Sequence, residues 1–186
     1  MTDSLEPTPI ADDLPRRFAD FDTVGEALDY AAQGKRGFNF HDARGNLVRP
    51  YPYAELRRDA IAAAKRLIDM GIKPGDRVAL IADTEPDFCA LFFGAVYAGA
   101  LPVPLPLPTS FGGKEGYIDQ LAVQLRSSEP QILLYPAEIA EISKAAADAC
   151  SVPGEDWESF ALRDAPDVEF PKAGPDDVAY LQYSSG

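Results

Sequence analysis

The chain has 186 residues, of which 46% are hydrophobic, and its 17 Lys and Arg stand against 30 Asp and Glu, a formal net charge of -13. This length and hydrophobic fraction suffice for one domain with its own core and exclude a chain that is disordered throughout. The excess of carboxylates excludes a general nucleic-acid binder, which needs a basic face, and disfavours binding to an anionic membrane surface.

The cysteines and the N-terminal residues indicate a cytoplasmic protein. Cys89 and Cys150 are the only two cysteines, too few for a disulfide framework, and with a single histidine they offer no zinc-binding spacing. The start, MTDSLEPTPIADDLPRR, lacks the basic and apolar regions of a secretory signal. The uncharged stretch from Phe88 is apolar only up to Leu101, where prolines interrupt it, so it fits a buried helix better than a membrane span.

The first part of the chain predicts an arm, a helix, a hairpin and a longer helix. Residues 1–20 are acidic and proline-rich, which predicts a flexible arm. Thr23 and Glu26 have capping-box spacing, which predicts a helix over 23–33. Aromatic and polar residues then alternate before the turn-rich segment DARGN, a pattern typical of a β-hairpin. An amphipathic helix follows over 53–70.

Three short apolar runs separated by helices predict a parallel sheet. The runs are residues 77–82, 101–105 and 131–135. Helices are predicted at 84–98 and 117–128 between them, and at 138–150 after them. The fold class is therefore α/β: a βαβαβ core with a mostly parallel sheet, right-handed crossovers, flanking helices and the N-terminal hairpin.

The second run carries proline at every even position from 102 to 108. Successive N–H groups of a strand point to opposite sides, so these prolines remove every donor on one side only. The odd-numbered residues Leu101, Val103 and Leu105 keep their donors on the other side. The pattern predicts a strand that is fully paired on one side only and then leaves the sheet as polyproline II; the alternative is a rigid loop.

The last segments are acidic and then extended. Eight carboxylates lie between Glu155 and Asp177, which predicts a surface segment with at most one short strand. Residues 177–183 read as extended again, and the chain stops at Ser-Ser-Gly.

Most motifs for chemistry are missing from this sequence. It has no GxxxxGK[ST], no GxGxxG after a strand and no GxSxG. His41 falls in the predicted hairpin and is interpreted as a surface or structural residue. Cys89 falls on the apolar helix and is interpreted as an inert core thiol.

The final residues Ser184, Ser185 and Gly186 are the remaining candidate site. Two hydroxyl groups, their backbone N–H groups and a glycine can wrap phosphate oxygens, whereas the alternative is a frayed terminus.

Four segments of the chain resemble the N-terminal part of the adenylate-forming superfamily, which includes acyl-CoA synthetases, adenylation domains and luciferases. They are YPYAEL, GIKPGDRVALIADTEPDFCALFFGAVYAGALPVPL, TSFGGKEGY and PDDVAYLQYSSG. The resemblance runs from about residue 21 to 186 and implies that Ser184, Ser185 and Gly186 are the first half of a loop that holds the ATP phosphates. It implies no catalytic residue and no metal ligand within this chain.

LPLP, TSFGG and LQYSSG look most like the fatty acyl-AMP ligases. These enzymes use ATP and Mg²⁺ to make a fatty acyl adenylate and pass it to an acyl carrier protein. A fatty acyl-CoA synthetase, with CoA as acceptor, and a non-catalytic α/β interaction module remain alternatives.

The resemblance further implies that 21–186 is a fragment of a larger N-terminal domain, truncated within the phosphate loop. The adenine site, the Mg²⁺-ligating glutamate, most of the acyl tunnel and the catalytic lysine would lie beyond residue 186. The fragment is therefore expected to need the remainder of its own chain, and to bind no ATP or Mg²⁺ and show no activity alone.

Overall fold

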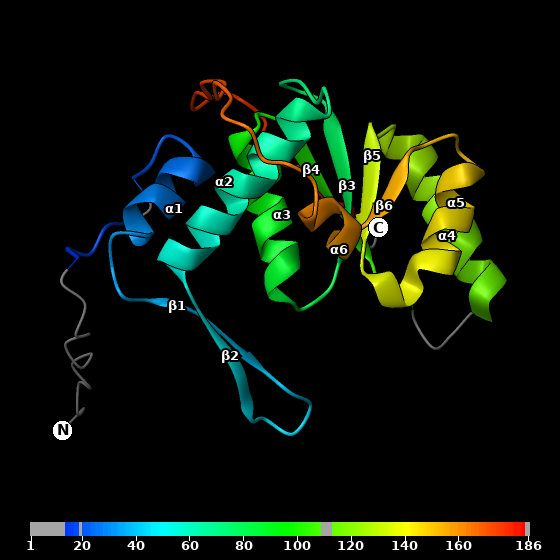
Figure 1. Cartoon of the computed structure of the whole chain (residues 1–186), viewed down its shortest axis with the longest axis horizontal. Helices are drawn as coiled ribbons and strands as arrows, with labels where there is room; N and C mark the ends of the chain where they lie inside the picture. The colour runs from blue at the N-terminus through cyan, green and yellow to red at the C-terminus, as the bar shows by residue number, and fades with distance from the viewer. Residues whose placement is uncertain (1–13, 19, 109–112, 185–186) are drawn as a thin grey trace, which may run out of the picture.

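A computed structural model describes residues 14–18, 20–108 and 113–184 of the chain (Figure 1). Its centre is a four-stranded sheet in the order β4-β3-β5-β6, in which every neighbouring pair is parallel. The strands are β3 (Arg77–Ala82), β4 (Leu101–Pro106), β5 (Ile132–Tyr135) and β6 (Gly154–Asp156). The three predicted strands and their parallel arrangement are thus confirmed, and β6 is the short strand allowed for near the acidic segment.

Helices cover both faces of this sheet because the strand residues alternate between two cores. Val78 and Leu80 of β3 point to the core formed with α2 (Tyr53–Asp69), α3 (Pro86–Tyr97) and α6 (Trp157–Ala161). Ala79 and Ile81 point to the opposite core, formed with α4 (Gly113–Ser128) and α5 (Ala140–Asp148). The predicted helix at 138–150 begins instead with a short 3-10 turn, η1 (Ala137–Ile139), which leads into α5.

The proline-rich strand β4 lies at the edge of the sheet, as its sequence predicts. The N–H of Leu101 donates to the carbonyl oxygen of Asp76, at 2.7 Å, on the side of β3. On the outer side the prolines offer carbonyl oxygens only. That of Pro102 accepts from the N–H of Leu181 at 3.0 Å, and that of Pro106 accepts from the hydroxyl of Tyr117 at 3.0 Å.

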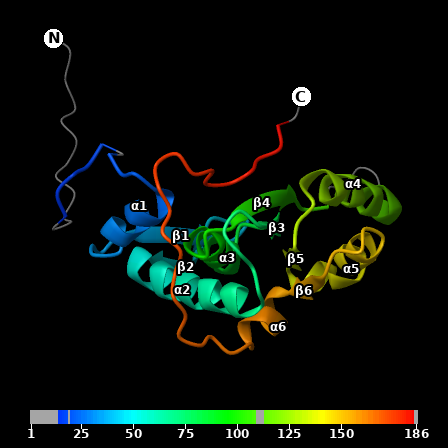
Figure 2. The same cartoon turned by 90° about the horizontal axis from the view of Figure 1, so that it is seen from above.

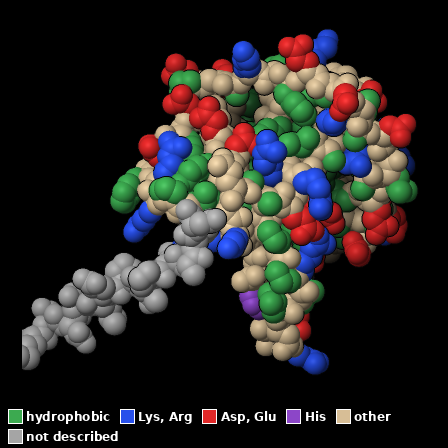
Figure 3. Space-filling model, turned by 60° about the vertical axis from the view of Figure 1, so that its left-hand side comes forward, with side chains coloured by type: hydrophobic (Ala, Val, Ile, Leu, Met, Phe, Trp, Pro, Cys, Tyr) green, Lys and Arg blue, Asp and Glu red, His purple; other side chains and the backbone are tan. Residues whose placement is uncertain are grey.

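The predicted N-terminal helix and hairpin are both present. Helix α1 (Val24–Ala31) starts at Thr23, whose hydroxyl accepts from the N–H of Glu26. Strands β1 (Gly37–His41) and β2 (Leu47–Pro52) form an antiparallel hairpin that projects from the body (Figures 1 and 3). Three hydrophobic side chains of this hairpin are exposed: Phe38, Leu47 and Val48.

The first predicted segment, the arm over 1–20, falls partly on residues 1–13 and 19, which lie outside the described residues. Within 14–18, the Arg17 guanidinium lies 3.9 Å from the centre of the Phe21 ring. The Tyr30 hydroxyl of α1 donates to the carbonyl oxygen of Pro15. The flexibility of the whole arm stays a prediction.

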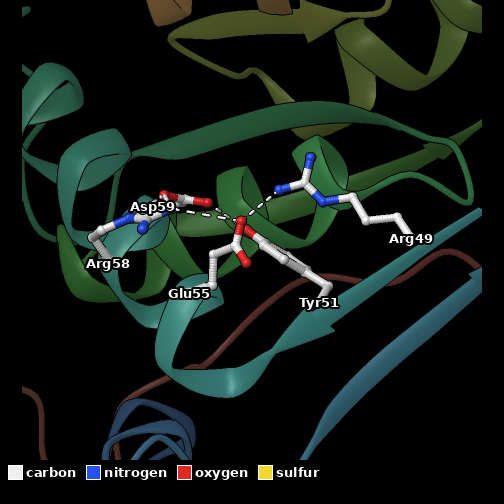
Figure 4. A network of polar contacts seen from close by, with 5 residues as sticks. All are labelled: Arg49, Tyr51, Glu55, Arg58 and Asp59. Atoms are coloured by element: carbon white, nitrogen blue, oxygen red, sulfur yellow. Dashed lines mark hydrogen bonds and ion pairs between the residues drawn. The ribbon is translucent and has the colours of Figure 1, made fainter.

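The base of the hairpin is fixed to α2 by polar contacts around a buried tyrosine (Figure 4). The Tyr51 hydroxyl donates to Asp59 at 3.0 Å, and Arg49 pairs with Glu55 at 2.6 Å. Arg58 pairs with the other oxygen of Asp59 at 2.9 Å. Burial raises the pKa of Tyr51, and the Asp59 carboxylate raises it further, so the phenol stays a hydrogen-bond donor at neutral pH.

Tyr51→Phe is expected to lower the free energy of unfolding by about 1 kcal/mol, the usual net worth of one hydrogen bond, because Asp59 loses a donor. Tyr53→Phe is the matched control, since it removes a hydroxyl from the next tyrosine, and should change stability by less than about 0.5 kcal/mol. Urea unfolding of the three proteins measures the effect. Equal losses in both variants would mean that the Tyr51–Asp59 bond does not hold the hairpin.

Candidate nucleotide site

The C-terminal segment 177–184 carries the start of the predicted phosphate loop and crosses the outer edge of β4 (Figure 2). Its side chains lie on both sides of that edge. The Tyr180 ring lies 5.7 Å from the Phe92 ring of α3, whereas Leu181 packs into the opposite core beside α4. The Tyr183 hydroxyl then donates to the carbonyl oxygen of Gln124 on α4, at 3.0 Å.

The extended conformation predicted for 177–183 does not become a fifth strand. One backbone hydrogen bond to β4, from Leu181, is formed by the described part of this segment. The reason is the proline pattern, because the outer side of β4 offers acceptors but no donors, and a ladder needs both. The segment is held by the side chains of Tyr180, Leu181 and Tyr183 instead.

Ser184 is the one predicted site residue that the structure describes, and it is exposed. Ser185 and Gly186 lie outside the described residues. Ser184 follows Leu181 by three positions, so it lies within about 11 Å of the place where the segment meets the amino end of β4.

A second location is indicated by the order of the strands. In open parallel sheets, ligands bind beyond the carboxyl ends of the strands where the order reverses, which here is between β3 and β5. The charged residues that follow β3 are Asp83 and Glu85, and the charged residue that follows β5 is Glu138. Their negative charges oppose a phosphate group. The sequence could not indicate this crevice, because an apolar run predicts a buried strand but does not specify which strands lie next to it.

Neither place fits a magnesium ion. Within the described ranges 14–18, 20–108 and 113–184, no group of three or more His, Cys, Asp or Glu side chains is arranged to hold a metal.

Two clefts adjoin these places. The larger, of about 660 Å³, lies between α1, the end of α3 and the segment 171–179, and it is within the size range of small-molecule sites. The smaller, of about 330 Å³, lies near the carboxyl ends of β4 and β5. Lys114 and Glu141 pair across its rim at 2.5 Å, and burial raises the pKa of Tyr117 in its wall to about 12.

The remaining reactive side chains take no part in either place. His41 is exposed on the projecting hairpin, in agreement with its interpretation as a surface residue. Burial raises the pKa of Cys89, so its thiol is a poor nucleophile. Among the described residues no helix is long and apolar enough to cross a membrane.

Comparisons with known proteins agree with the α/β fold of the chain. The model of the family described as AMP-binding enzyme matches residues 38–186. A chain from structural studies of fatty acyl-adenylate ligases from E. coli and L. pneumophila superposes with a TM-score of 0.88 at 39% identity, over 92% of this chain and 31% of that one.

Curated relatives carry the same chemistry in their names. A Caulobacter vibrioides protein that carries the name acyl-CoA synthetase is 44% identical over 96% of this chain and 31% of its own length. A long-chain fatty acid–AMP ligase of Mycolicibacterium smegmatis is 30% identical over 87% of this chain and 25% of its own. A long-chain fatty acid–CoA ligase of Mycobacterium tuberculosis is 33% identical over 72% of this chain and 27% of its own.

The chain thus spans a quarter to a third of the length of these relatives. The family match covers more than half of the chain, includes all four strands of the sheet, and ends on the Ser-Ser-Gly segment. The chain belongs to the AMP-binding, or adenylate-forming, enzyme family.

Proposed function

We propose that the chain is part of a cytoplasmic, ATP-dependent ligase that activates a fatty acid as its acyl adenylate. The 39% identity to a fatty acyl-adenylate ligase structure over 92% of the chain carries this proposal. The relatives named for fatty acid–AMP and fatty acid–CoA ligation support the same substrate class.

In this proposal Ser184, Ser185 and Gly186 begin the loop that binds the ATP phosphates. The exposed Ser184 hydroxyl can donate to a phosphate oxygen, and backbone N–H groups next to a glycine can do the same. In adenylation, a carboxylate attacks the α-phosphorus and pyrophosphate leaves, so oriented donors are most valuable where negative charge builds up. When bound, Mg²⁺ would neutralise further charge on the ATP phosphates.

We further propose an acyl carrier protein, rather than CoA, as the acceptor. The support is the resemblance of LPVPLPLPTSFGG and YLQYSSG to fatty acyl-AMP ligases. The relatives divide on this point, since one of comparable identity is named as an AMP ligase and another as a CoA ligase.

A chimera tests both statements. Residues 1–186 replace the matching 31% of the Caulobacter relative, and the two sequences are 44% identical over the aligned part. The purified chimera receives ATP, a fatty acid, CoA and a phosphopantetheinylated carrier protein together. Formation of acyl adenylate followed by acyl transfer mainly to the carrier protein is the expected result.

Two controls accompany this assay. The 186-residue chain alone is expected to give no ATP–pyrophosphate exchange, because it holds only the start of the phosphate loop. The Caulobacter relative itself shows which acceptor is used when its own matching segment is present. A chimera that makes mainly fatty acyl-CoA would contradict the acceptor, and one that activates no fatty acid while the relative does would contradict the substrate class.

A further inference from the structure

The outer edge of strand β1 in the projecting hairpin has no partner strand. The sheet of the hairpin consists of β1 and β2, so among the described residues one side of β1 has no neighbour. The hairpin projects from the body of the molecule, and all residues of β1 except Phe40 are exposed (Figures 1 and 3). An edge of this kind presents a row of N–H and C=O groups to which a further strand can add.

The hydrogen bonds at the two ends of β1 show which of its backbone groups face outward. The carbonyl oxygen of Arg36, just before β1, accepts from the N–H of Tyr53 at 2.8 Å. The N–H of Asp42, just after β1, donates to the carbonyl oxygen of Asn46 at 2.9 Å. Both bonds are made on the side of β2, and successive residues of a strand point to opposite sides. The odd-numbered residues of β1 therefore direct their backbone groups away from β2: Gly37, Asn39 and His41.

The prolines of β2 agree with this pattern and make the other edge of the hairpin poor in donors. Pro50 lies opposite Asn39, and Pro52 lies opposite Gly37. At such positions of an antiparallel pair the backbone groups of both strands point outward, so the two prolines lack the N–H groups of the outer edge of β2. The register shift in this pair adds Val48 to β2 and leaves β1 regular. The hairpin thus has one edge with both donors and acceptors, that of β1.

We propose that the outer edge of β1 pairs with the same edge of a second copy of this chain, in an antiparallel arrangement centred on Asn39. In this register Gly37 of one copy lies opposite His41 of the other. All three outward-facing residues of each strand then form hydrogen-bonded pairs. A shift of the centre to Phe38 or Phe40 would leave one outward-facing residue of each strand without a partner in β1.

The side chains of β1 are complementary to themselves in this register. Phe38 would lie opposite Phe40 of the second copy, at a position where the side chains of neighbouring strands are closest. Phe38 is 39% exposed, and its ring lies 6.3 Å from that of Phe40 in its own strand, so four rings would form one cluster across the axis. The small Gly37 would lie opposite the imidazole of His41.

The charges at the ends of β1 are complementary as well. Arg36 would lie opposite Asp42 of the second copy, so a pair of opposite charges forms at each end of the contact. These matches of ring, size and charge arise between identical segments, which makes a second copy the partner. The assembly closes at two copies, because each copy contributes its single β1 edge to a self-complementary contact.

Concentration-dependent association provides the first test. Two strands of five residues make a contact smaller than a standard interface, so a weak dimer is expected. Sedimentation equilibrium between about 10 µM and about 1 mM covers the range of such affinities and should show the average mass rising toward that of a dimer.

Asn39→Pro should weaken this association by at least about tenfold, because it removes the N–H group on the axis of the dimer while the bonds to β2 come from the neighbouring residues. Val48→Glu is the matched control, since Val48 is 67% exposed on the other strand, and it should associate like the parent chain. Urea unfolding of each variant shows whether the fold is retained.

Disulfide cross-linking tests the register without a proline variant. Asn39→Cys places two thiols opposite each other across the axis, with Cα atoms about 5.5 Å apart, which suits a disulfide. His41→Cys is the control on the same edge, because residue 41 of the two copies would be four residues, or about 13 Å, apart. Under mild oxidation Asn39→Cys should form the covalent dimer at least about tenfold faster. Peptide mass spectrometry distinguishes this bond from any that involves Cys89 or Cys150.

Three results would overturn the proposal. The first is a parent chain that stays monomeric at about 1 mM. The second is equal association of Asn39→Pro and the parent, which would assign the contact to another surface. The third comes from the Caulobacter chimera, in which the same cross-link is expected: a cross-link confined to the 186-residue chain would assign the edge to later residues of a longer chain. None of these measurements requires turnover, so they are independent of the proposed function.

Discussion

Gly94→Val is expected to lower the free energy of unfolding by about 3 kcal/mol, the upper part of the range for overpacking a core. A Cβ atom at Gly94 would lie 2.6 Å from the Cβ atom of Ala63 and 3.1 Å from the carbonyl oxygen of Ala60, both on α2. Backbone and short side chains cannot move aside as the end of a long side chain can. The two helices would therefore have to separate, and both carry buried residues of the same core.

The control is Gly116→Ala, also a helical glycine but with no atom within 4 Å of the added Cβ. It should raise stability by about 0.5–1 kcal/mol, because alanine is the better helix former. Thermal unfolding monitored by circular dichroism distinguishes the two variants. The melting temperature of Gly94→Val is expected to fall by about 6–12 °C. A Gly94→Val protein that melts with the parent chain would show that α2 and α3 do not pack as closely as described.

The double substitution Ser184→Ala and Ser185→Ala should reduce the rate of acyl adenylate formation by about 100-fold in the chimera, the usual effect of losing an oriented donor to developing charge. The proposed function places both hydroxyl groups against phosphate oxygens, and the Ser184 side chain is exposed and available for this contact. ATP–pyrophosphate exchange measures the adenylation step.

Thioester formation from preformed acyl adenylate serves as the internal control for this variant. It should fall much less, because pyrophosphate has already left and the charge that the serines stabilise no longer develops. If both steps fell equally, the serines would be supporting the fold or the acyl group. If neither changed, the segment would not be a phosphate loop.

The sequence predicts the strands of this fold better than it predicts their order. The apolar runs of β3, β4 and β5 are short and nearly free of charge, so each identifies itself as a buried parallel strand. The sequence of such a run does not determine which strand lies next to it in the sheet. The prolines of β4 are the exception, because a strand that lacks its donors on one side can be fully paired only at the edge of the sheet.

The candidate site was predictable from the sequence only as a segment. The Ser-Ser-Gly motif indicates where the proposed phosphate loop starts, but the position of Ser184 depends on tertiary contacts of Tyr180 and Tyr183 with α3 and α4. These contacts join residues about 60 to 90 positions apart, and no local pattern encodes them. Gly94 did leave a signal, since a glycine inside an apolar helix usually has a packing reason.

The prolines at the outer edge of β4 have a consequence for how this protein can misassemble. A long edge strand with free donors and acceptors is a template for cross-β growth, in which identical strands of many molecules stack into fibrils. Pro50 and Pro52 lie on the strand β2, so the projecting hairpin also has an edge that is poor in donors. Regular cross-β growth from the outer edges of β4 and β2 is therefore blocked, because each lacks the donors that a ladder needs.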